Sequence, residues 1–232
     1  PMCWRVSALD KYTLISNSDA HSPAKLGREV NIFEGENIDY FKIVEAIKKG
    51  GKPGPSLALE MKATIEFFPE EGKYHYDGHR NCGIRFSPEE TKKYNGICPV
   101  CGRPLTLGVL YRVEQLADRP PGYKPKTALP FYSLVPLEEV IADVLGLTSS
   151  SQQVKNEYNN LLKHFDNEFN ILLDVPQEDL EKITKPKIAE GIIRVREGKV
   201  TKEPGYDCVF GKIKIFGNEE KEKELNKQKT LF

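Results

Sequence analysis

Four potential metal ligands in one loop-rich stretch constrain this chain more than any other feature. Two residues separate His79 from Cys82, two separate Cys98 from Cys101, and fifteen lie between the pairs. Zinc takes four tetrahedral nitrogen or sulfur ligands, and a two-residue spacing lets one turn supply two of them. Gly102 follows the last cysteine and tolerates the positive φ with which backbone folds around a ligating sulfur. With four protein ligands no position stays open for water, so the sequence predicts a structural zinc site at these four residues.

Two alternatives compete with this ligand set. His75 could replace His79, although six residues between His75 and Cys82 make a poorer spacing. The second cysteine pair could instead be a redox pair, which would need the start of a helix close by. Pro104 and the strand-like pattern of Leu105–Leu110 disfavour a helix there.

The bulk composition describes a water-exposed, loop-rich chain. Of its 232 residues, 39% are hydrophobic, enough for one large domain or two small ones. No apolar run approaches the roughly 18 residues that a membrane span needs, and no signal peptide is visible. Cys3 and Cys208 lie far from the ligand cluster, so we expect two unpaired thiols and a reducing, cytoplasmic location. The chain starts with Pro1 rather than Met, and we expect that an N-terminal part of a longer protein is missing.

Charge is balanced overall and uneven locally. The chain has 34 basic and 34 acidic residues, but residues 73–126 hold ten basic against five acidic and residues 181–216 hold nine against five. Two basic islands suit a nucleic-acid groove, whereas ordinary solvated faces explain them equally simply. The residues predicted to contact phosphate are Arg80, Arg85, Lys92, Lys93, Arg103, Lys185, Lys187, Arg194 and Arg196.

Local patterns predict α/β structure first and mainly helical structure later. We expect a buried strand at 12–16, a helix at 40–49 with Phe41, Val44 and Ile47 on one face, and a half-buried strand at 59–67 with strict alternation. Further along we expect a helix at 137–145, a long helix through 154–172, a third helix from Pro176 capped by Asp174, and a strand at 209–216. The expected domains are residues 1–69, a zinc-binding module at 70–126, a mainly helical domain at 127–216 and a charged tail at 217–232.

Asp19 and His21 stand two residues apart, directly after the predicted strand at 12–16. In extended backbone this spacing points both side chains to the same side. A carboxylate and an imidazole converging at a strand end are good ligands for a catalytic metal. A capping Asp with a surface His explains the pair as well.

Three stretches together resemble endonuclease Q, a family of DNA repair enzymes. They are Asn17-Ser-Asp-Ala-His-Ser-Pro-Ala-Lys-Leu-Gly-Arg-Glu, Glu66-Phe-Phe-Pro-Glu-Glu-Gly-Lys-Tyr-His-Tyr-Asp-Gly-His-Arg and Gly96-Ile-Cys-Pro-Val-Cys-Gly-Arg-Pro-Leu-Thr. The likeness continues through Ala189-Glu-Gly-Ile-Ile-Arg-Val-Arg-Glu-Gly and Pro204-Gly-Tyr-Asp, so it covers nearly the whole chain. The family is built on a PHP (polymerase and histidinol phosphatase) domain, a distorted β/α barrel with metal ligands at the carboxyl ends of its strands.

The resemblance implies a metal-dependent endonuclease that cuts DNA on the 5′ side of uracil, hypoxanthine, xanthine or an abasic site. Asp19 and His21 match the last ligand motif of the barrel, which would hold Zn, Mg or Mn. The family's first motif, a His-x-His, and its middle ligands are absent from this chain. The chain therefore resembles the C-terminal half of the enzyme, with residues 1–69 as the end of the barrel, and we expect no cleavage by this part alone.

Reading a deaminated base requires that it leave the stack, where an aromatic ring can contact it. The zinc module offers Tyr74, His75, Tyr76 and Phe86 for such contact, although these rings could simply pack the module. Two alternative functions remain: a non-catalytic zinc-containing DNA-binding module, and a PHP phosphoesterase acting on small substrates. The basic islands and the zinc module disfavour the latter.

The C-terminal tip is similar to the peptide with which repair proteins bind the sliding clamp, PCNA. Gln228 and Leu231 match the first and fourth positions of that peptide, while Phe232 is out of register for its aromatic positions. A charged segment ending in a short apolar tip suits a clamp partner, and a frayed terminus is the simpler alternative.

Overall fold

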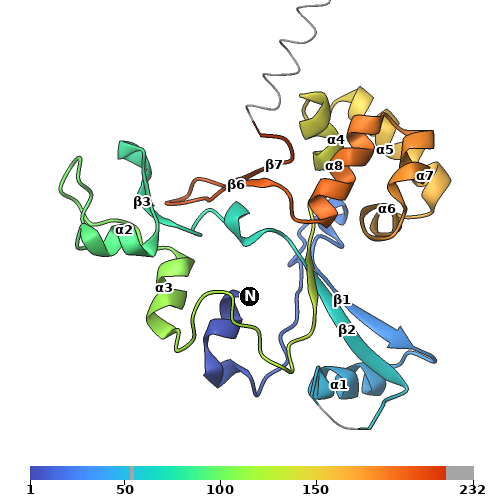
Figure 1. The fold of residues 1–232 in the computed structure, drawn as a ribbon, viewed down its shortest axis with the longest axis horizontal. Coiled ribbons are helices and arrows are strands. Elements are labelled where there is room, and N and C mark those ends of the chain that lie inside the picture. The colour runs from blue at the N-terminus through green and yellow to red at the C-terminus, as the bar shows by residue number, and fades with distance from the viewer. Residues whose placement is uncertain (53–54, 218–232) are drawn as a thin grey trace, which may run out of the picture. The chain divides into compact units, whose positions relative to one another are not determined.

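The chain divides into two compact units, each described here by itself (Figure 1). The computed structural model describes residues 1–52 and 55–217. The first unit comprises Pro1–Tyr132 together with Pro204–Gly211, and the second comprises Ser133–Glu203 with the described residues from Lys212 onward. Gln228, Leu231 and Phe232, predicted to bind a clamp, lie outside the described residues. Within the part that is described, no helix is both long and apolar enough to cross a membrane.

Short elements build the first unit. Its strands are β1 (Val30–Gly35), β2 (Leu59–Glu66), β3 (Asp77–His79), β4 (Ile84–Phe86) and β5 (Phe131–Ser133), the last ending at the boundary between the units. Its α-helices are α1 (Tyr40–Lys49), α2 (Pro88–Lys93) and α3 (Val109–Leu116). Its 3-10 helices are η1 (Met2–Arg5), η2 (Ser7–Leu9), η3 (Pro23–Lys25), η4 (Pro69–Glu71) and η5 (Arg80–Cys82).

The sheet β1-β2-β5 carries the core of this unit. β1 pairs antiparallel with β2, with a bulge between Ile32 and Phe33. Of the five residues predicted to face inward, Leu59, Met61, Ala63 and Ile65 are buried on β2, whereas Phe67 is half-buried and lies just after the strand. The strict alternation of buried and exposed residues is not confirmed, because Thr64, on the opposite face of the strand, is buried too. As the middle strand of three, β2 has part of its second face covered.

The helix predicted at 40–49 is confirmed as α1, with its cap. The Asp39 carboxylate accepts a hydrogen bond from the Lys42 N–H at 2.9 Å, and Gly50 ends the helix. Of the three residues predicted to share one face of this helix, Phe41 is 75% exposed, and the buried residue of the helix is Ala46.

The strand predicted at 12–16 is wrong. The segment is irregular, and Leu14 and Ile15 are exposed. The backbone of Ser16 is hydrogen-bonded to the Asn31 side chain. The Asn31 Oδ1 accepts from the Ser16 N–H at 2.9 Å, and the Asn31 Nδ2 donates to the Ser16 carbonyl at 2.8 Å. One residue of β1 therefore satisfies both backbone groups of Ser16, which a strand ladder would otherwise have paired.

The strand predicted at Leu105–Leu110 is also wrong, since α3 begins at Val109. The first amides of α3 are held by an earlier segment: Val109 N–H donates to the Tyr74 carbonyl at 2.7 Å and Leu110 N–H to the His75 carbonyl at 3.1 Å. The buried Asp77 carboxylate accepts from the N–H of Gly108, the residue before the helix, at 2.6 Å. These partners satisfy amides that a helix start leaves open.

The second unit is a helical bundle with a two-stranded ribbon. Its elements are α4 (Leu137–Leu145), α5 (Gln152–Phe165), α6 (Glu168–Leu173), α7 (Gln177–Ile183), α8 (Pro186–Arg196), β6 (Thr201–Glu203) and β7 (Lys212–Lys214). α8 packs against α4, α6 and α7. Its core side chains are fully buried, namely Leu137, Val140, Ile141, Val154, Leu161, Ile171, Leu180, Ile188, Ile192 and Val195.

The sequence located these helices but not all of their ends. α4 matches the prediction and ends at the left-handed Gly146. The single long helix through 154–172 is wrong, because Asp166 turns to φ 64° and the Asn167 side chain caps a new helix by accepting from the Asn170 N–H. Asp174 does not cap α7; it ends α6, and Pro176 precedes α7. The strand predicted at 209–216 is confined to β7.

Arg196 closes the open end of α6. Its guanidinium donates to the carbonyls of Leu172 at 3.0 Å, Ile171 at 3.1 Å and Val175 at 2.9 Å. Burial lowers the pKa of this guanidinium, which the acidic neighbours Asp174 and Glu197 partly offset. The last carbonyls of a helix have no partner of their own, so a buried cation there is stabilising.

We predict that Arg196→Met lowers the free energy of unfolding by about 2 kcal/mol, because three carbonyls lose a charged donor. Urea unfolding, with hydrogen exchange of the α6 and α8 amides, measures the loss. Lys199→Met, at an exposed position nearby, is the matched control and should leave stability within about 0.5 kcal/mol of the parent. Equal stability of the Arg196 and Lys199 variants would show that this cap does not matter.

Candidate metal centre and its surroundings

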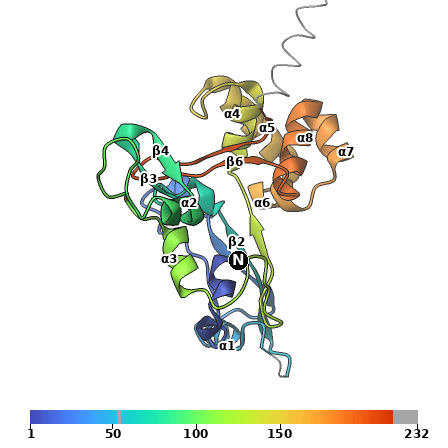
Figure 2. The ribbon, with the colours of Figure 1, turned by 60° about the vertical axis from the view of Figure 1, so that its left-hand side comes forward.

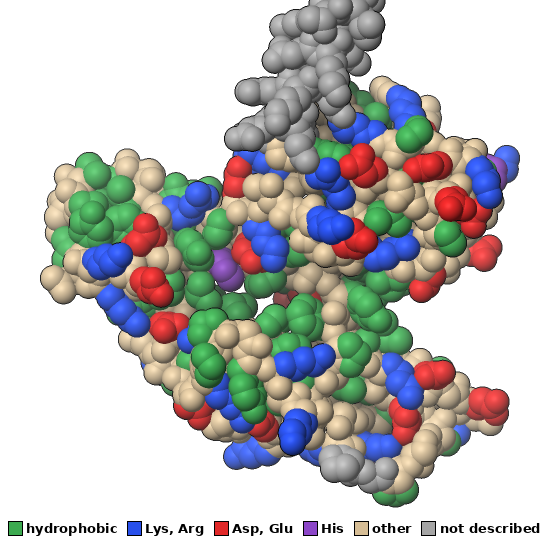
Figure 3. Space-filling view, viewed as in Figure 1, with side chains coloured by type: hydrophobic (Ala, Val, Ile, Leu, Met, Phe, Trp, Pro, Cys, Tyr) green, Lys and Arg blue, Asp and Glu red, His purple; other side chains and the backbone are tan. Residues whose placement is uncertain are grey.

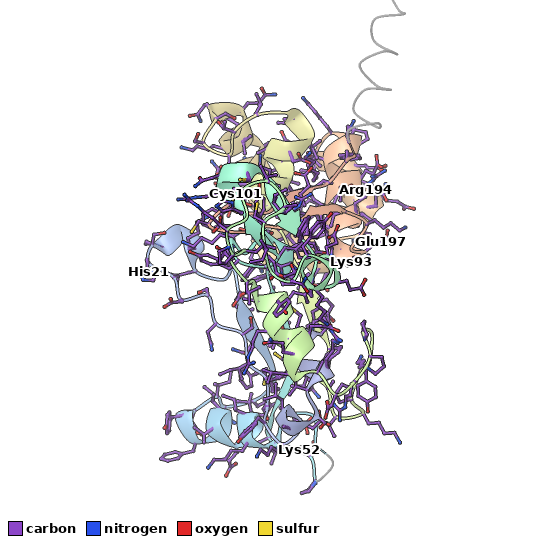
Figure 4. All side chains as sticks on the ribbon, turned by 90° about the vertical axis from the view of Figure 1, so that its left-hand side faces the viewer. His21, Lys52, Lys93, Cys101, Arg194 and Glu197 are labelled. Atoms are coloured by element: carbon purple, nitrogen blue, oxygen red, sulfur yellow. The ribbon has the colours of Figure 1, made fainter. Side chains whose placement is uncertain are left out.

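The four ligands predicted from spacing come together in the first unit. The ligand atoms of His79, Cys82, Cys98 and Cys101 all lie within 4.8 Å of one another, which confirms them as one cluster. His79 ends β3 and Cys82 ends η5, so a tight turn between β3 and β4 supplies the first pair. Figure 2 shows β3 and β4 side by side, and Figure 4 marks Cys101 in the same module.

The second pair lies on a knuckle whose backbone folds around the sulfurs. The Gly102 N–H donates to the Cys98 carbonyl at 2.9 Å, with Gly102 at φ 72°, and the Cys98 N–H donates to the Arg103 carbonyl at 2.8 Å. The His79 Nδ1 lies 3.3 Å from the Cys101 sulfur. His75 is buried outside the cluster, stacked on Tyr76 with the ring centroids 5.5 Å apart, so the alternative ligand set is wrong.

Electrostatics make the cluster unfavourable without a cation. Burial opposes ionisation of Cys98, but backbone N–H groups of Cys101 and Val100, together with His79, outweigh it and lower the pKa of this thiol to about 6. Burial and the neighbouring sulfurs raise the pKa of Cys82 to about 11. Three thiols in contact cannot all ionise unless positive charge lies between them, and a divalent metal supplies that charge.

The module around the cluster has almost no hydrophobic core. Among residues 70–126, all of which the structure describes, Leu105 is the only Leu, Ile, Val or Phe side chain that is buried. The strands β3 and β4 have three residues each. A module this small needs a cross-link in place of a core, and four ligands on two turns can provide one.

The second predicted ligand pair does not converge as expected. Asp19 and His21 are both exposed, and Asp19 is left-handed at φ 47° rather than extended. The His21 Nδ1 lies 2.7 Å from the Asp19 carbonyl oxygen, so the ring faces its own backbone (Figure 4). In the described residues the Cys/His cluster is the only group of three or more potential ligands. Metal binding by this pair stays a prediction.

A cavity of about 520 Å³ lies in the same unit. Trp4, Asn17, Glu29 and Glu66 are among its lining residues, and Asn17 precedes Asp19 by two positions. Burial raises the pKa of Glu29 above its usual range, and the Glu66 carboxylate adds to the rise. No sequence pattern indicates this cavity, because its walls come from segments far apart in the chain.

The residues predicted to contact phosphate divide into two groups. Those of the zinc module are exposed, namely Arg80, Arg85, Lys92, Lys93 and Arg103, and so is Lys185. In the second unit the Lys187 ammonium and the Arg194 guanidinium lie 4.7 Å and 4.4 Å from the centroid of the Phe216 ring. Arg196 holds the end of α6, a structural role that the sequence did not indicate.

The residues predicted to contact a base also differ in solvent exposure. Tyr74 is 39% exposed, whereas His75 is buried and Tyr76 is half-buried. Phe86 is stacked on Tyr94 with the ring centroids 4.9 Å apart. Tyr74 therefore remains the ring most open to a ligand.

Two family models match parts of the chain: a PHP-associated model at residues 7–51 and the MJ0043 C-terminal domain at residues 136–199. Among curated proteins, the chain is 38% identical to the uncharacterised protein MJ0043 of Methanocaldococcus jannaschii, over 86% of this chain and 25% of that protein. It is 29% identical to the uncharacterised protein YqxK of Bacillus subtilis, over 92% of this chain and 49% of that protein.

Two solved structures share the fold. The lesion-specific endonuclease Q of Pyrococcus furiosus matches with a TM-score of 0.80 and 32% identity, over 92% of this chain and 52% of that one. Endonuclease Q in complex with a 27-mer duplex bearing an abasic lesion matches with a TM-score of 0.77 and 32% identity, over 94% of this chain and 53% of that one. The chain thus spans about half of these enzymes and of YqxK, and a quarter of MJ0043.

The fold and the site define a mixed α/β chain with a PHP-associated segment and a Cys/His cluster suited to a metal ion. More closely, the chain is similar in fold and in sequence to about half of endonuclease Q.

We predict that Cys98→Ala abolishes stoichiometric metal binding and unfolds the zinc module. Structural zinc contributes about 10–16 kcal/mol in zinc-finger peptides, and the module has little else to hold it. Elemental analysis should find one zinc per parent chain, and hydrogen exchange over 73–110 should show loss of protection in the variant. Cys3→Ala, at an exposed cysteine outside the cluster, is the control. Full protection in a metal-free parent would rule out a structural metal.

Proposed function

We propose that the protein containing this chain is a metal-dependent DNA repair endonuclease that cuts the phosphodiester on the 5′ side of a damaged nucleotide. The supporting observation is the structural match, with a TM-score of 0.80, to a lesion-specific endonuclease over nearly the whole chain. The second matched structure holds duplex DNA with an abasic lesion at its active site, which makes damaged duplex the substrate class to test first. Uracil, hypoxanthine, xanthine and abasic sites are the lesions we propose.

In this proposal residues 1–69 are the C-terminal part of the PHP domain, and residues 70–126 are a module held by structural zinc. Residues 127–216 are the helical domain, except for the loop at residues 204–211, which belongs to the first unit. Asp19 and His21 are catalytic metal ligands, which need the remaining ligands of the whole protein. A divalent metal at such a site supplies an activated hydroxide and stabilises charge on the phosphate. His21 would have to turn away from the Asp19 carbonyl to reach a metal.

A non-catalytic DNA-binding module is the second candidate. It is favoured by the absence of any potential ligand group of three or more besides the Cys/His cluster in the described part of the chain. In this alternative the zinc module and Lys185 bind phosphates without hydrolysis. A whole protein that binds lesion-bearing duplex and leaves it uncut with Zn, Mg or Mn would support this candidate.

We predict that Asp19→Ala and His21→Ala each reduce nicking of uracil- or hypoxanthine-containing duplex by the whole protein at least about 100-fold, since each removes a metal ligand. Binding of the same duplex should change less than about threefold. Single-turnover nicking and fluorescence anisotropy measure the two effects. Asp39→Ala, which removes a helix cap at another place in the chain, serves as the control for general damage. Parent-level turnover in either ligand variant would remove that residue from the active site.

We predict a salt-dependent affinity for DNA that the exposed cations of the zinc module carry. Replacing Lys93 or Arg103 by Ala should lower the slope of log K against log salt by roughly 0.9 for each phosphate that is no longer neutralised. Lys185→Ala in the second unit should lower the slope by the same amount. Lys48→Ala on α1, outside both basic islands, is the control and should leave the slope unchanged. A slope that none of these variants alters would contradict phosphate contacts at these positions.

A further inference from the structure

The loop at residues 204–211 joins the zinc module from a distant part of the chain. Backbone hydrogen bonds fix it there, from Gly205 N–H to the Glu70 carbonyl, Tyr76 N–H to the Gly205 carbonyl, Cys208 N–H to the Lys73 carbonyl and Gly211 N–H to the Glu71 carbonyl, all between 2.8 and 3.0 Å. A Cβ on Gly205 would lie 2.4 Å from the Gly72 carbonyl oxygen, so only glycine fits this position. The loop is therefore a fixed part of the module.

Its backbone is held in a strained form. Asp207 and Cys208 are consecutive non-glycine residues with φ of 40° and 70°. Such residues cost free energy and persist only where the surroundings determine them. The Asp207 carboxylate supplies that support, because it accepts from the Arg80 N–H and the Thr106 hydroxyl at 2.7 Å each. The turn sets the direction of the two residues that follow it.

Those two residues are apolar and point to solvent. Phe210 is 70% exposed and Val209 is 39% exposed. The Lys73 ammonium lies 5.7 Å from the centroid of the Phe210 ring and 5.7 Å from that of Tyr74. The Tyr74 hydroxyl lies 2.8 Å from the Cys208 sulfur, which holds that ring beside the loop. Two open rings and a cation thus form one surface on a rigid support, which we name the aromatic tip (Lys73, Tyr74, Val209 and Phe210).

The surroundings of the aromatic tip favour nucleic acid over an apolar protein partner. Exposed Arg80 and Arg85 lie on the same module, within the basic island of residues 73–126. In the space-filling view, hydrophobic and basic side chains lie next to one another over the module that contains β3 and α2, with acidic side chains among them (Figure 3). Rings stack on bases while neighbouring cations meet phosphates, which is the combination that binds unstacked nucleic acid.

We propose that the aromatic tip is a wedge that stacks Phe210 into the gap left in duplex DNA by a missing or extruded base. This inference rests on the proposed function and adds the element that senses the gap. An undamaged stack has no space for the ring, whereas an abasic site does, so the wedge favours the lesion over intact duplex. Lys73 would stand beside the phosphate that flanks the gap. Tyr74, the most open of the rings singled out from the sequence, forms the side of the same wedge.

Binding to two duplexes tests the wedge. One carries an abasic site opposite 2-aminopurine and the other is identical but undamaged. Phe210→Ala should weaken binding of the abasic duplex about tenfold, leave the undamaged duplex within about twofold, and remove the change in 2-aminopurine fluorescence. Phe210→Trp should retain the parent's preference. Phe41→Ala, at an equally exposed Phe on α1, is the matched control and should bind both duplexes like the parent.

Three results would overturn the proposal that Phe210 is a wedge. In the first, Phe210→Ala keeps the parent's preference for the abasic duplex and its fluorescence change. In the others, the parent shows no preference between the two duplexes, or binds neither of them. Urea unfolding of Phe210→Ala is expected to match the parent, because the ring is exposed. The readout is binding, so a whole protein that never nicks would end the proposed function and leave this result standing. A protein that nicks normally with Phe210→Ala, at parent affinity, would end only the wedge.

Discussion

The clustering of three thiols and one imidazole within 4.8 Å is the constraint on which the rest of the zinc module depends. Between residues 70 and 126 the chain buries too little apolar side chain to offset the entropy of ordering its loops. A divalent cation at the cluster would both neutralise the thiolates and join two turns that are far apart in sequence. Such a cross-link would help to fix the positions of the basic residues and open rings that the module presents to solvent.

The loop at residues 204–211 depends on the same module and strengthens it in return. Burial opposes ionisation of Asp207, but hydrogen bonds from the Arg80 N–H and the Thr106 hydroxyl outweigh it and lower the pKa of the carboxyl. Since its folded pKa is depressed, this carboxylate stabilises the module fully above the unfolded pKa of roughly 3.9, and the stabilisation disappears as pH falls through the folded pKa. The Arg80 N–H that donates to Asp207 belongs to the residue after His79, so the loop supports the backbone next to the Cys/His cluster directly.

Local signals explain which parts of the fold could be predicted. The helix between Asp39 and Gly50 has a cap at each end. Each pair of predicted metal ligands has a spacing that one turn can serve, so short stretches of sequence were enough for both predictions. The break at Asp166 has neither Gly nor Pro to announce it, and only the structure shows the left-handed turn there. The segment 12–16 is apolar enough for a strand, but it forms no ladder, and at its last residue the Asn31 side chain pairs with the Ser16 backbone instead.

The residue types of the candidate site could be predicted from the sequence, but their exposure and contacts could not. Charge is a property of one residue, whereas its exposure and its partners come from the packing of distant segments. Arg103 and Arg196 look alike in the sequence, yet one is exposed and the other donates three hydrogen bonds to the end of α6. Phe210 shows the reverse case. An isolated Phe in a turn belongs to no sequence pattern that would single it out. It becomes a candidate for stacking only because the fold places it beside Lys73 and near Tyr74, on a loop that backbone hydrogen bonds hold in place.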